Sequence, residues 1–156
     1  MKLHTLAIDP GKHTLAAAWG VNELEGTALW AGFESPCAIN RWVNAWCAET
    51  ATRLVIERPL IREGAAVRKM DILDLTLTVG AASVGTARGV EYVWPNTWGA
   101  AGKDTPEAKA RTQRRVLRRL SDVEAARVKL PGLKELDHNV WDAVGIWLWS
   151  QGRYGP

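Results

Sequence analysis

The segment Leu6-Ala7-Ile8-Asp9-Pro10-Gly11 decides the fold, because an apolar strand ends there in a carboxylate at a tight turn. The segment Leu54-Val55-Ile56-Glu57 likewise carries an apolar strand into an acid, and Asp142 lies in an apolar helical stretch. A carboxylate at the end of a hydrophobic element is costly to desolvate unless something binds it, and a divalent cation is the ligand that compensates best. The pattern predicts a metal-dependent site.

The length of the chain limits its organisation. Its 156 residues, 47% of them hydrophobic, predict a single domain over residues 1–156. No apolar run is long enough to span a membrane, and the N-terminus lacks the pattern of a secretory signal, so we expect an intracellular, cytoplasmic and soluble protein. Cys37 and Cys47 fall in one predicted helix, too far apart for a disulfide, and we expect free thiols.

The net charge of +3 and the pI near 9.1 are mildly basic, and by themselves they do not establish a nucleic-acid partner. The distribution of basic and acidic residues along the chain is more informative. Arginine and lysine gather in residues 58–69 and 103–129, whereas acids are scattered through the first half of the chain and its C-terminal segment. We expect the two basic segments to contribute to one face.

The hydrophobic pattern predicts a mixed sheet. Strands are expected over residues 3–8, 15–21, 27–33, 53–56 and 90–94, and helices over 36–50, 64–84, 105–120 and 137–150. Three strands in succession, followed by alternating helices and strands, indicate an α/β fold with helices on the sheet. Residues 129–136 are expected to form a surface loop.

The helix predicted over Gly64–Val84 is apolar on two faces. Leu77 belongs to one face, and Leu75, Val79 and Ala82 belong to the nearly opposite one. A helix of this kind needs cover on both sides. One face can pack on the sheet, and two alternatives remain open for the other: a second helix of the same chain, or the same helix of a second subunit.

The helix predicted from Thr105 has a basic face. Its arginines are Arg111, Arg114, Arg115 and Arg118, and Val116, Leu117 and Leu120 lie on the other side. A solvated surface is the default reading of such a face, and contact with a DNA backbone is the functional one. Lys109 is the exception, because it projects toward the apolar side near the start of the helix, from where it can reach the site.

In the final helix, His138, Asn139 and Asp142 share one face, because they are three or four residues apart. Asp9 before Pro-Gly, Glu57 at a strand end and Asp142-Ala143 in an apolar helix, in this order over the whole chain, resemble the RuvC-type Holliday junction resolvases. The resemblance implies an RNase H-like fold: a mixed five-stranded sheet, three antiparallel strands and then two parallel ones, with helices on both faces. In that fold the first and fourth strands are neighbours, so Asp9 and Glu57 would lie side by side and Asp142 would face them.

The resemblance also implies a Mg²⁺-dependent endodeoxyribonuclease acting on four-way DNA junctions as a homodimer, here through the 64–84 helix. Two Mg²⁺ ions per site are expected, with Mn²⁺ as a substitute. Asp9 would bridge the ions, Glu57 would bind the ion that activates water, and Asp142 would bind the other. Lys109 matches a family lysine that neutralises charge on the phosphate.

The chain departs from the family at the last acid motif. The family commonly has Asp or His three residues before the motif aspartate, where this chain has Asn139, preceded by His138. An amide can bind a metal through its carbonyl but carries no charge. Asn139 can be a natural variant of this position or an engineered acid-to-amide change, and the sequence is compatible with both. We expect His138 to be a structural residue or to support a metal ligand; direct metal binding by His138 is the less favoured alternative.

A second departure concerns the segment after Glu57. Leu60-Ile61 stands where family members often have an aromatic wedge, and apolar side chains can also insert between bases. Phosphate contacts are expected there from Arg58, Arg62, Arg68 and Lys69. The stretch Trp94-Pro95-Asn96-Thr97-Trp98 leading to Lys103 resembles a loop beside the family's active site, and Trp98 is the tryptophan expected to remain open for DNA contact.

The favoured function is resolution of four-way junctions by paired symmetric nicks. An RNA-processing nuclease of the same fold is the alternative enzyme. A junction-binding protein without cleavage is a third reading, which depends on whether Asn139 abolishes metal binding.

Overall fold

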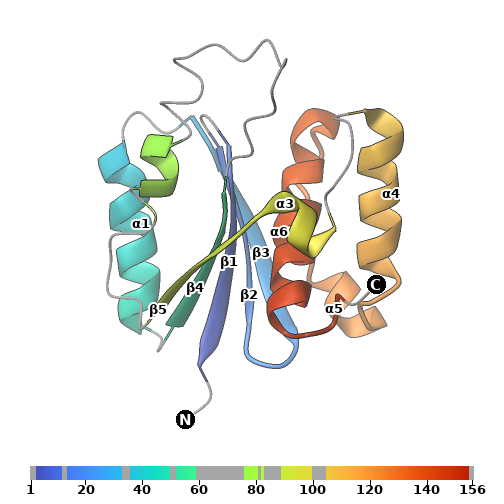
Figure 1. Cartoon of the computed structure of the whole chain (residues 1–156), viewed down its shortest axis with the longest axis horizontal. Helices are drawn as coiled ribbons and strands as arrows, with labels where there is room; N and C mark the ends of the chain where they lie inside the picture. The colour runs from blue at the N-terminus through green and yellow to red at the C-terminus, as the bar shows by residue number, and fades with distance from the viewer. Residues whose placement is uncertain are drawn as a thin grey trace.

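A computed structural model describes residues 3–11, 14–32, 36–49, 52–58, 76–80, 82, 89–99 and 105–154. Its centre is a five-stranded sheet, flanked by helices on both faces (Figure 1). The strands are β1 (His4–Pro10), β2 (Thr14–Gly20), β3 (Leu24–Ala31), β4 (Thr52–Glu57) and β5 (Gly89–Val93).

The sheet has the strand order β3-β2-β1-β4-β5. β1 pairs antiparallel with β2, and β2 pairs antiparallel with β3. β1 and β4 are parallel, as are β4 and β5. The predicted fold class, three antiparallel strands followed by two parallel ones, is confirmed, and it places the first and fourth strands next to each other.

Alternation along the strands divides the core into two layers. Leu6 and Ile8 of β1 pack on the face covered by α1 (Pro36–Glu49), where they meet Ile39 and Val43. Ala7 faces the other way and packs with the helix α6 (Lys134–Ser150). Because successive side chains of a strand point to opposite faces, every second residue of β1 and β4 is directed toward α6.

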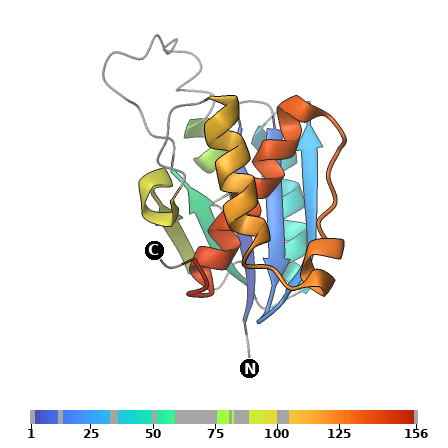
Figure 2. The same ribbon diagram turned by 90° about the vertical axis from the view of Figure 1, so that its right-hand side faces the viewer.

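α6 is the central helix of its layer. Val140, Val144 and Trp147 are fully buried against the sheet, as their spacing predicted. Beside α6 lies α4 (Pro106–Leu117), and the two helices run side by side in front of the sheet (Figure 2). This pair of helices brings the first turns of α6 and α4 to the same end of the molecule.

Two short helices were not predicted. α3 (Pro95–Trp98) lies in the expected loop, and α5 (Asp122–Ala126) follows α4. A capping box formed by Ser121 and Glu124 starts α5, and that S-x-x-E pattern was readable in the sequence. Arg153 donates to Glu124 at 2.6 and 2.7 Å, so this acid ties α5 to the C-terminal end of the chain.

Several boundaries differ from the prediction. β3 begins at Leu24, earlier than expected, and the register of its pairing with β2 shifts between Trp19 and Gly20. α4 ends at Leu117, and that side chain is 38% exposed, so its assignment to the apolar face was wrong. α6 starts at Lys134, which shortens the expected loop.

The predicted helix over residues 64–84 is described at residues 76–80 and 82, which are helical; the rest of it lies outside the described residues. Ala82 is buried in the α1-side core, and Val79 packs against that core. Leu77, on the opposite side, is 48% exposed. The face of Val79 and Ala82 is therefore covered within the chain, and the face of Leu77 is the open one.

Both cysteines are free thiols, as predicted. No helix in the described ranges is both long enough and apolar enough to cross a membrane.

Candidate functional site

Asp9 and Glu57 end two neighbouring parallel strands. The register pairs Ile8 with Ile56, so the next residue of each strand is one of the two acids. Ala7 and Val55 face α6, and by alternation Asp9 and Glu57 face it as well. The sheet thus places two carboxylates side by side under α6, at the carboxyl ends of β1 and β4.

Asp142 completes the acidic group from α6. Burial raises the pKa of Asp9 well above its ordinary value, and the nearby carboxylates of Glu57 and Asp142 raise it further. A carboxylate responds in this way to like charges a few ångströms away. The three acids that the sequence predicted as one site therefore interact electrostatically, although they come from distant parts of the chain.

Glu57 is held by a tryptophan. The indole Nε1 of Trp98 donates to its carboxylate at 2.5 Å. Burial raises the pKa of Glu57 to about 7; the Trp98 hydrogen bond lowers this pKa, and the charge of Asp142 raises it. The Glu57 carboxyl is consequently poised between its protonated and ionised forms near neutral pH.

Trp98 owes its position to Gly145 of α6. A Cβ atom at residue 145 would lie 2.3 Å from Cζ3 of the Trp98 ring, closer than real Cβ contacts allow. Gly145 therefore leaves room for the six-membered ring of the indole next to α6, from where Nε1 reaches Glu57. α3 ends at Gly99, whose φ of 100° is in the left-handed region that favours glycine.

His138, Asn139 and Lys109 lie on the helices that border the acids. His138 and Asn139 belong to the early turns of α6 and are half-buried. Lys109 is half-buried near the start of α4 and lies two turns before Val116, on the side of α4 that packs toward α6. Their placement is compatible with the roles expected of them.

The donor set suits a hard divalent cation. Asp9, Glu57 and Asp142 offer carboxylate oxygens and Asn139 an amide oxygen, which are the ligands that Mg²⁺ and Mn²⁺ accept. Burial is the main reason that the pKa values of Asp9 and Glu57 are raised, and neighbouring carboxylates raise them further; a bound cation would offset both effects. Within the described ranges, no three His, Cys, Asp or Glu side chains already form a cluster that could hold a metal ion. The chemistry of these donors fits such a cation.

The expected DNA contacts divide into three groups. Arg58, Arg111, Arg114 and Arg118 are exposed. Arg115 instead lies over the Tyr154 ring, at 4.6 Å from its centroid, and is half-buried. The remaining ones lie outside the described residues: Leu60, Ile61, Arg62, Arg68, Lys69 and Lys103.

The expectation for Trp98 was wrong. Its side chain is 1% exposed, so it has no face open to DNA. The buried indole instead donates a hydrogen bond to Glu57. The exposed aromatic residues nearby are Tyr92 and Trp94, at 40% and 44%. The sequence did carry a signal for Trp98, because a glycine within the otherwise apolar α6 often marks a close approach by another group.

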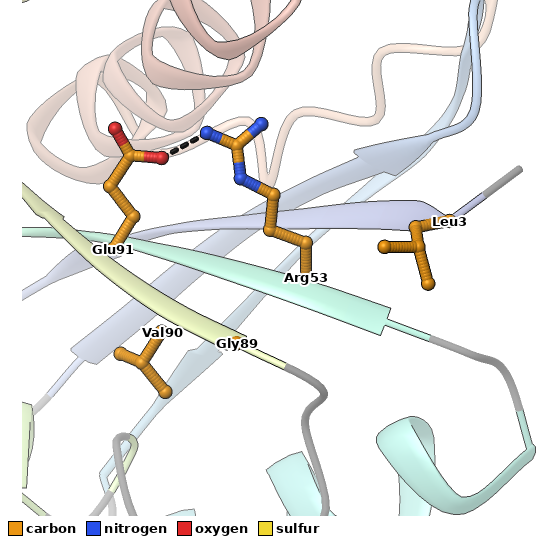
Figure 3. Close-up of a pocket in the computed structure, with 5 residues that line it drawn as sticks. All are labelled: Leu3, Arg53, Gly89, Val90 and Glu91. Atoms are coloured by element: carbon orange, nitrogen blue, oxygen red, sulfur yellow. Dashed lines mark hydrogen bonds and ion pairs between the residues drawn. The ribbon is translucent and has the colours of Figure 1, made fainter.

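A shallow cavity of about 310 Å³ lies elsewhere, at the beginning of β4 and β5. Arg53 and Glu91 line it and form an ion pair on one side of the sheet, while Val90 points to the other side (Figure 3). Glu57 lies at the other end of β4, next to the end of β1 that carries Asp9, so the cavity is separate from the candidate site.

Comparison with known proteins gives structural matches without sequence matches. No protein-family model matches the chain, and no curated protein matches it. Among solved structures, Thermus thermophilus RuvC in complex with a Holliday junction substrate has a TM-score of 0.61 and 14% identity, over 99% of both chains. Another Thermus thermophilus RuvC structure gives 0.56 and 16%, again over 99% of both chains. The yeast mitochondrial Holliday junction resolvase Ydc2 gives 0.52 and 10%, over 98% of this chain and 80% of that one. At these identities the likeness establishes the fold, and the chain has a RuvC-like fold of the RNase H-like type.

Proposed function

We propose that this chain is a divalent-cation-dependent DNA endonuclease that resolves four-way junctions by paired symmetric nicks. The observation that carries the proposal is the meeting of Asp9 and Glu57 at adjacent strand ends, electrostatically coupled to Asp142 of α6. The likeness to a RuvC structure solved with a Holliday junction substrate supports the choice of DNA substrate.

The side chains have distinct tasks in this proposal. Asp9, Glu57 and Asp142 would hold Mg²⁺ or Mn²⁺ ions, two per site, and the Asn139 carbonyl would add a neutral ligand beside His138. Ions bound there would supply activation of water and stabilisation of the leaving oxygen. Trp98 donates to one oxygen of Glu57 and so orients this carboxylate, and Lys109 would neutralise charge on the phosphate.

Cutting two strands of a junction symmetrically calls for two copies of the site, and we propose a homodimer. Leu77 supports this proposal, because it is an exposed large apolar side chain on the described part of the 64–84 helix. The exposed arginines Arg111, Arg114 and Arg118 of α4 would follow the phosphates of a junction arm.

A junction-binding protein without cleavage is the second candidate. Asn139 favours it, because an amide stands where the family commonly has a charged or imidazole ligand. Metal-dependent nicking separates the two candidates.

The decisive experiment is cleavage of a labelled synthetic four-way junction, with linear duplex and an RNA–DNA hybrid as competing substrates. We expect paired nicks confined to the junction with Mg²⁺ or Mn²⁺, and none with a chelator. Asp9→Asn and Glu57→Gln should lose nicking and keep junction binding, since each removes a charged ligand and leaves the arginines in place. Glu23→Gln makes the same carboxylate-to-amide change at a side chain that is 71% exposed, and it should cut like the wild type.

Three outcomes would contradict the proposal in different ways. Junction binding without nicks in any metal would favour the binding-only candidate. Preferential cutting of the RNA–DNA hybrid would favour an RNA-processing nuclease. Nicking retained by Asp9→Asn would show that the acids are not the site.

A further inference from the structure

Arg58, Tyr92 and Trp94 form an exposed cluster immediately beyond Glu57, which we call the aromatic platform. The Arg58 guanidinium carbon lies 4.9 Å from the centre of the Tyr92 ring and 5.2 Å from that of Trp94. Tyr92 is 40% exposed and Trp94 is 44% exposed, and Arg58 is exposed as well. Two large aromatic side chains and an arginine thus share one open surface at the edge strand of the sheet.

Backbone pairing places this platform at the end of the sheet where Glu57 lies. The Arg58 amide donates to the Val93 carbonyl at 2.8 Å, which extends the pairing of β4 with β5 one step past Glu57. Trp94 continues β5 in an extended conformation, with φ of −83° and ψ of 145°, before α3 begins. The platform is therefore built on strand backbone, and consecutive Cα atoms such as those of Glu57 and Arg58 are about 3.8 Å apart.

Alternation places the platform on the other side of the sheet from the acids. Val93 packs in the core beneath α6, so Tyr92 and Trp94 are directed to the α1 side. The same rule sends Glu57 toward α6 and Arg58 toward the α1 side. A DNA strand that runs across the end of β4 would thus contact the carboxylates on the α6 side and then the aromatic rings on the α1 side.

We propose that the aromatic platform stacks unpaired nucleobases of a single-stranded segment next to the strand that is cut. An aromatic face is sequence-tolerant, because every base has a π-face, and Arg58 can both stack on a base and pair with the phosphate beside it. A hydrophobic partner protein fits this surface less well, because a guanidinium covers part of both rings. The inference rests on the proposed nuclease function for its location, but its test does not require cutting.

The location of the aromatic platform also bears on the aromatic wedge that RuvC-type resolvases often have after the motif glutamate. The segment directly after Glu57 carries Leu60-Ile61 and no aromatic residue. The platform supplies aromatic surface from the neighbouring strand β5. Bases that unpair where junction strands exchange would then have a place to stack at the same end of the sheet as the acids.

The test compares two fluorescently labelled single-stranded oligonucleotides in chelator, one with bases and one abasic with the same phosphates. Anisotropy should report tighter binding of the base-bearing strand by the wild type, by roughly 5- to 150-fold for each stacked base. Tyr92→Ala and Trp94→Ala should each erase much of this ratio. Trp94→Phe and Tyr92→Phe keep a ring and should keep most of it.

Matched controls separate stacking from charge and from folding. Val123→Ala removes an apolar side chain that is 58% exposed on α5, and should leave the ratio unchanged. Arg58→Lys keeps the charge and loses the planar group, so it should lower the ratio more than the affinity for the abasic strand. Circular dichroism melts of each variant show whether it folds as stably as the wild type.

Two results would overturn the platform. The first is an unchanged ratio in both alanine variants, whether or not the wild type nicks junctions. The second is a fall in sedimenting mass of Trp94→Ala with the ratio intact, which would make this surface a contact between copies. A wild type that prefers bases and never nicks would uphold the platform and count against the nuclease function.

Discussion

Gly145→Ala tests whether α6 positions Glu57 through Trp98. The added Cβ would lie 2.3 Å from Cζ3 of the indole, and the ring is 1% exposed and packed edge-on against Tyr154. Carbon atoms in contact prefer about 3.5 to 4.0 Å, so the ring must withdraw by roughly 1.2 Å or more. The ring has little room to move, and its hydrogen bond to Glu57 is the interaction that the displacement would weaken most.

The expected magnitude follows from three contributions. Overpacking costs about 1 to 3 kcal/mol, while the alanine recovers about 1 kcal/mol of helix propensity. A withdrawal of this size stretches the 2.5 Å hydrogen bond beyond a useful length, which costs about 1.5 to 3 kcal/mol for a bond to a charged group. We expect a net destabilisation of about 1.5 to 5 kcal/mol, or roughly 3 to 20 °C in thermal midpoint.

The assay is thermal unfolding in chelator and in Mn²⁺, followed by nicking of the labelled junction. Gly80→Ala is the matched control, because Gly80 is also helical and a Cβ there meets nothing within 4 Å. It should be neutral or slightly stabilising. Trp98→Phe keeps most of the ring and removes the donor, so it should weaken nicking more than it weakens folding. A Gly145→Ala protein as stable and active as the wild type would refute this reasoning.

Three further predictions concern the metal site, the assembly and the acid sensitivity of the fold. Asn139→Asp adds a charge beside Asp142, and we expect about tenfold less Mn²⁺ to suffice for half-maximal thermal stabilisation; an unchanged or higher requirement would remove residue 139 from the ligand set. Leu77→Asp should reduce the sedimenting mass to that of a monomer, whereas Val123→Asp, at another exposed apolar position, should not; equal masses for the two variants would mean that the Leu77 face is not the dimer contact. The hydrogen bond from Arg153 lowers the pKa of Glu124 from 4.5 to about 2, so the stabilisation from this group is fully present above about pH 4.5 and is lost as the pH falls toward 2. Glu124→Gln should cost about 3 kcal/mol at neutral pH, because it breaks a largely buried ion pair, and should flatten the acid limb of a plot of thermal midpoint against pH; an acid limb identical to that of the wild type would show that other carboxylates govern it.

The sequence by itself determined the elements that depend on local periodicity. The alternation of Leu6, Ala7 and Ile8 defines a strand with two buried faces, and the spacing of Val140, Val144 and Trp147 defines a buried helix. The resemblance to the RuvC-type resolvases implied a sheet in which the first and fourth strands are neighbours, and the structure pairs these two strands. From that adjacency the pairing of Asp9 with Glu57 follows, because the ends of parallel neighbours share one edge.

The tertiary structure alone decided what surrounds those acids. Trp98 and Glu57 are 41 residues apart, and their hydrogen bond depends on α3 packing against α6 at Gly145. Trp98 was expected to be open to DNA because it falls in a predicted loop, and Leu117 was placed on the apolar face of its helix; the structure buries Trp98 and exposes Leu117. Periodicity reports which side of an element is apolar, whereas the elements that cover each side are distant in sequence. The clustering of Arg58, Tyr92 and Trp94 on one open face likewise depends on the pairing of strands that are distant in sequence.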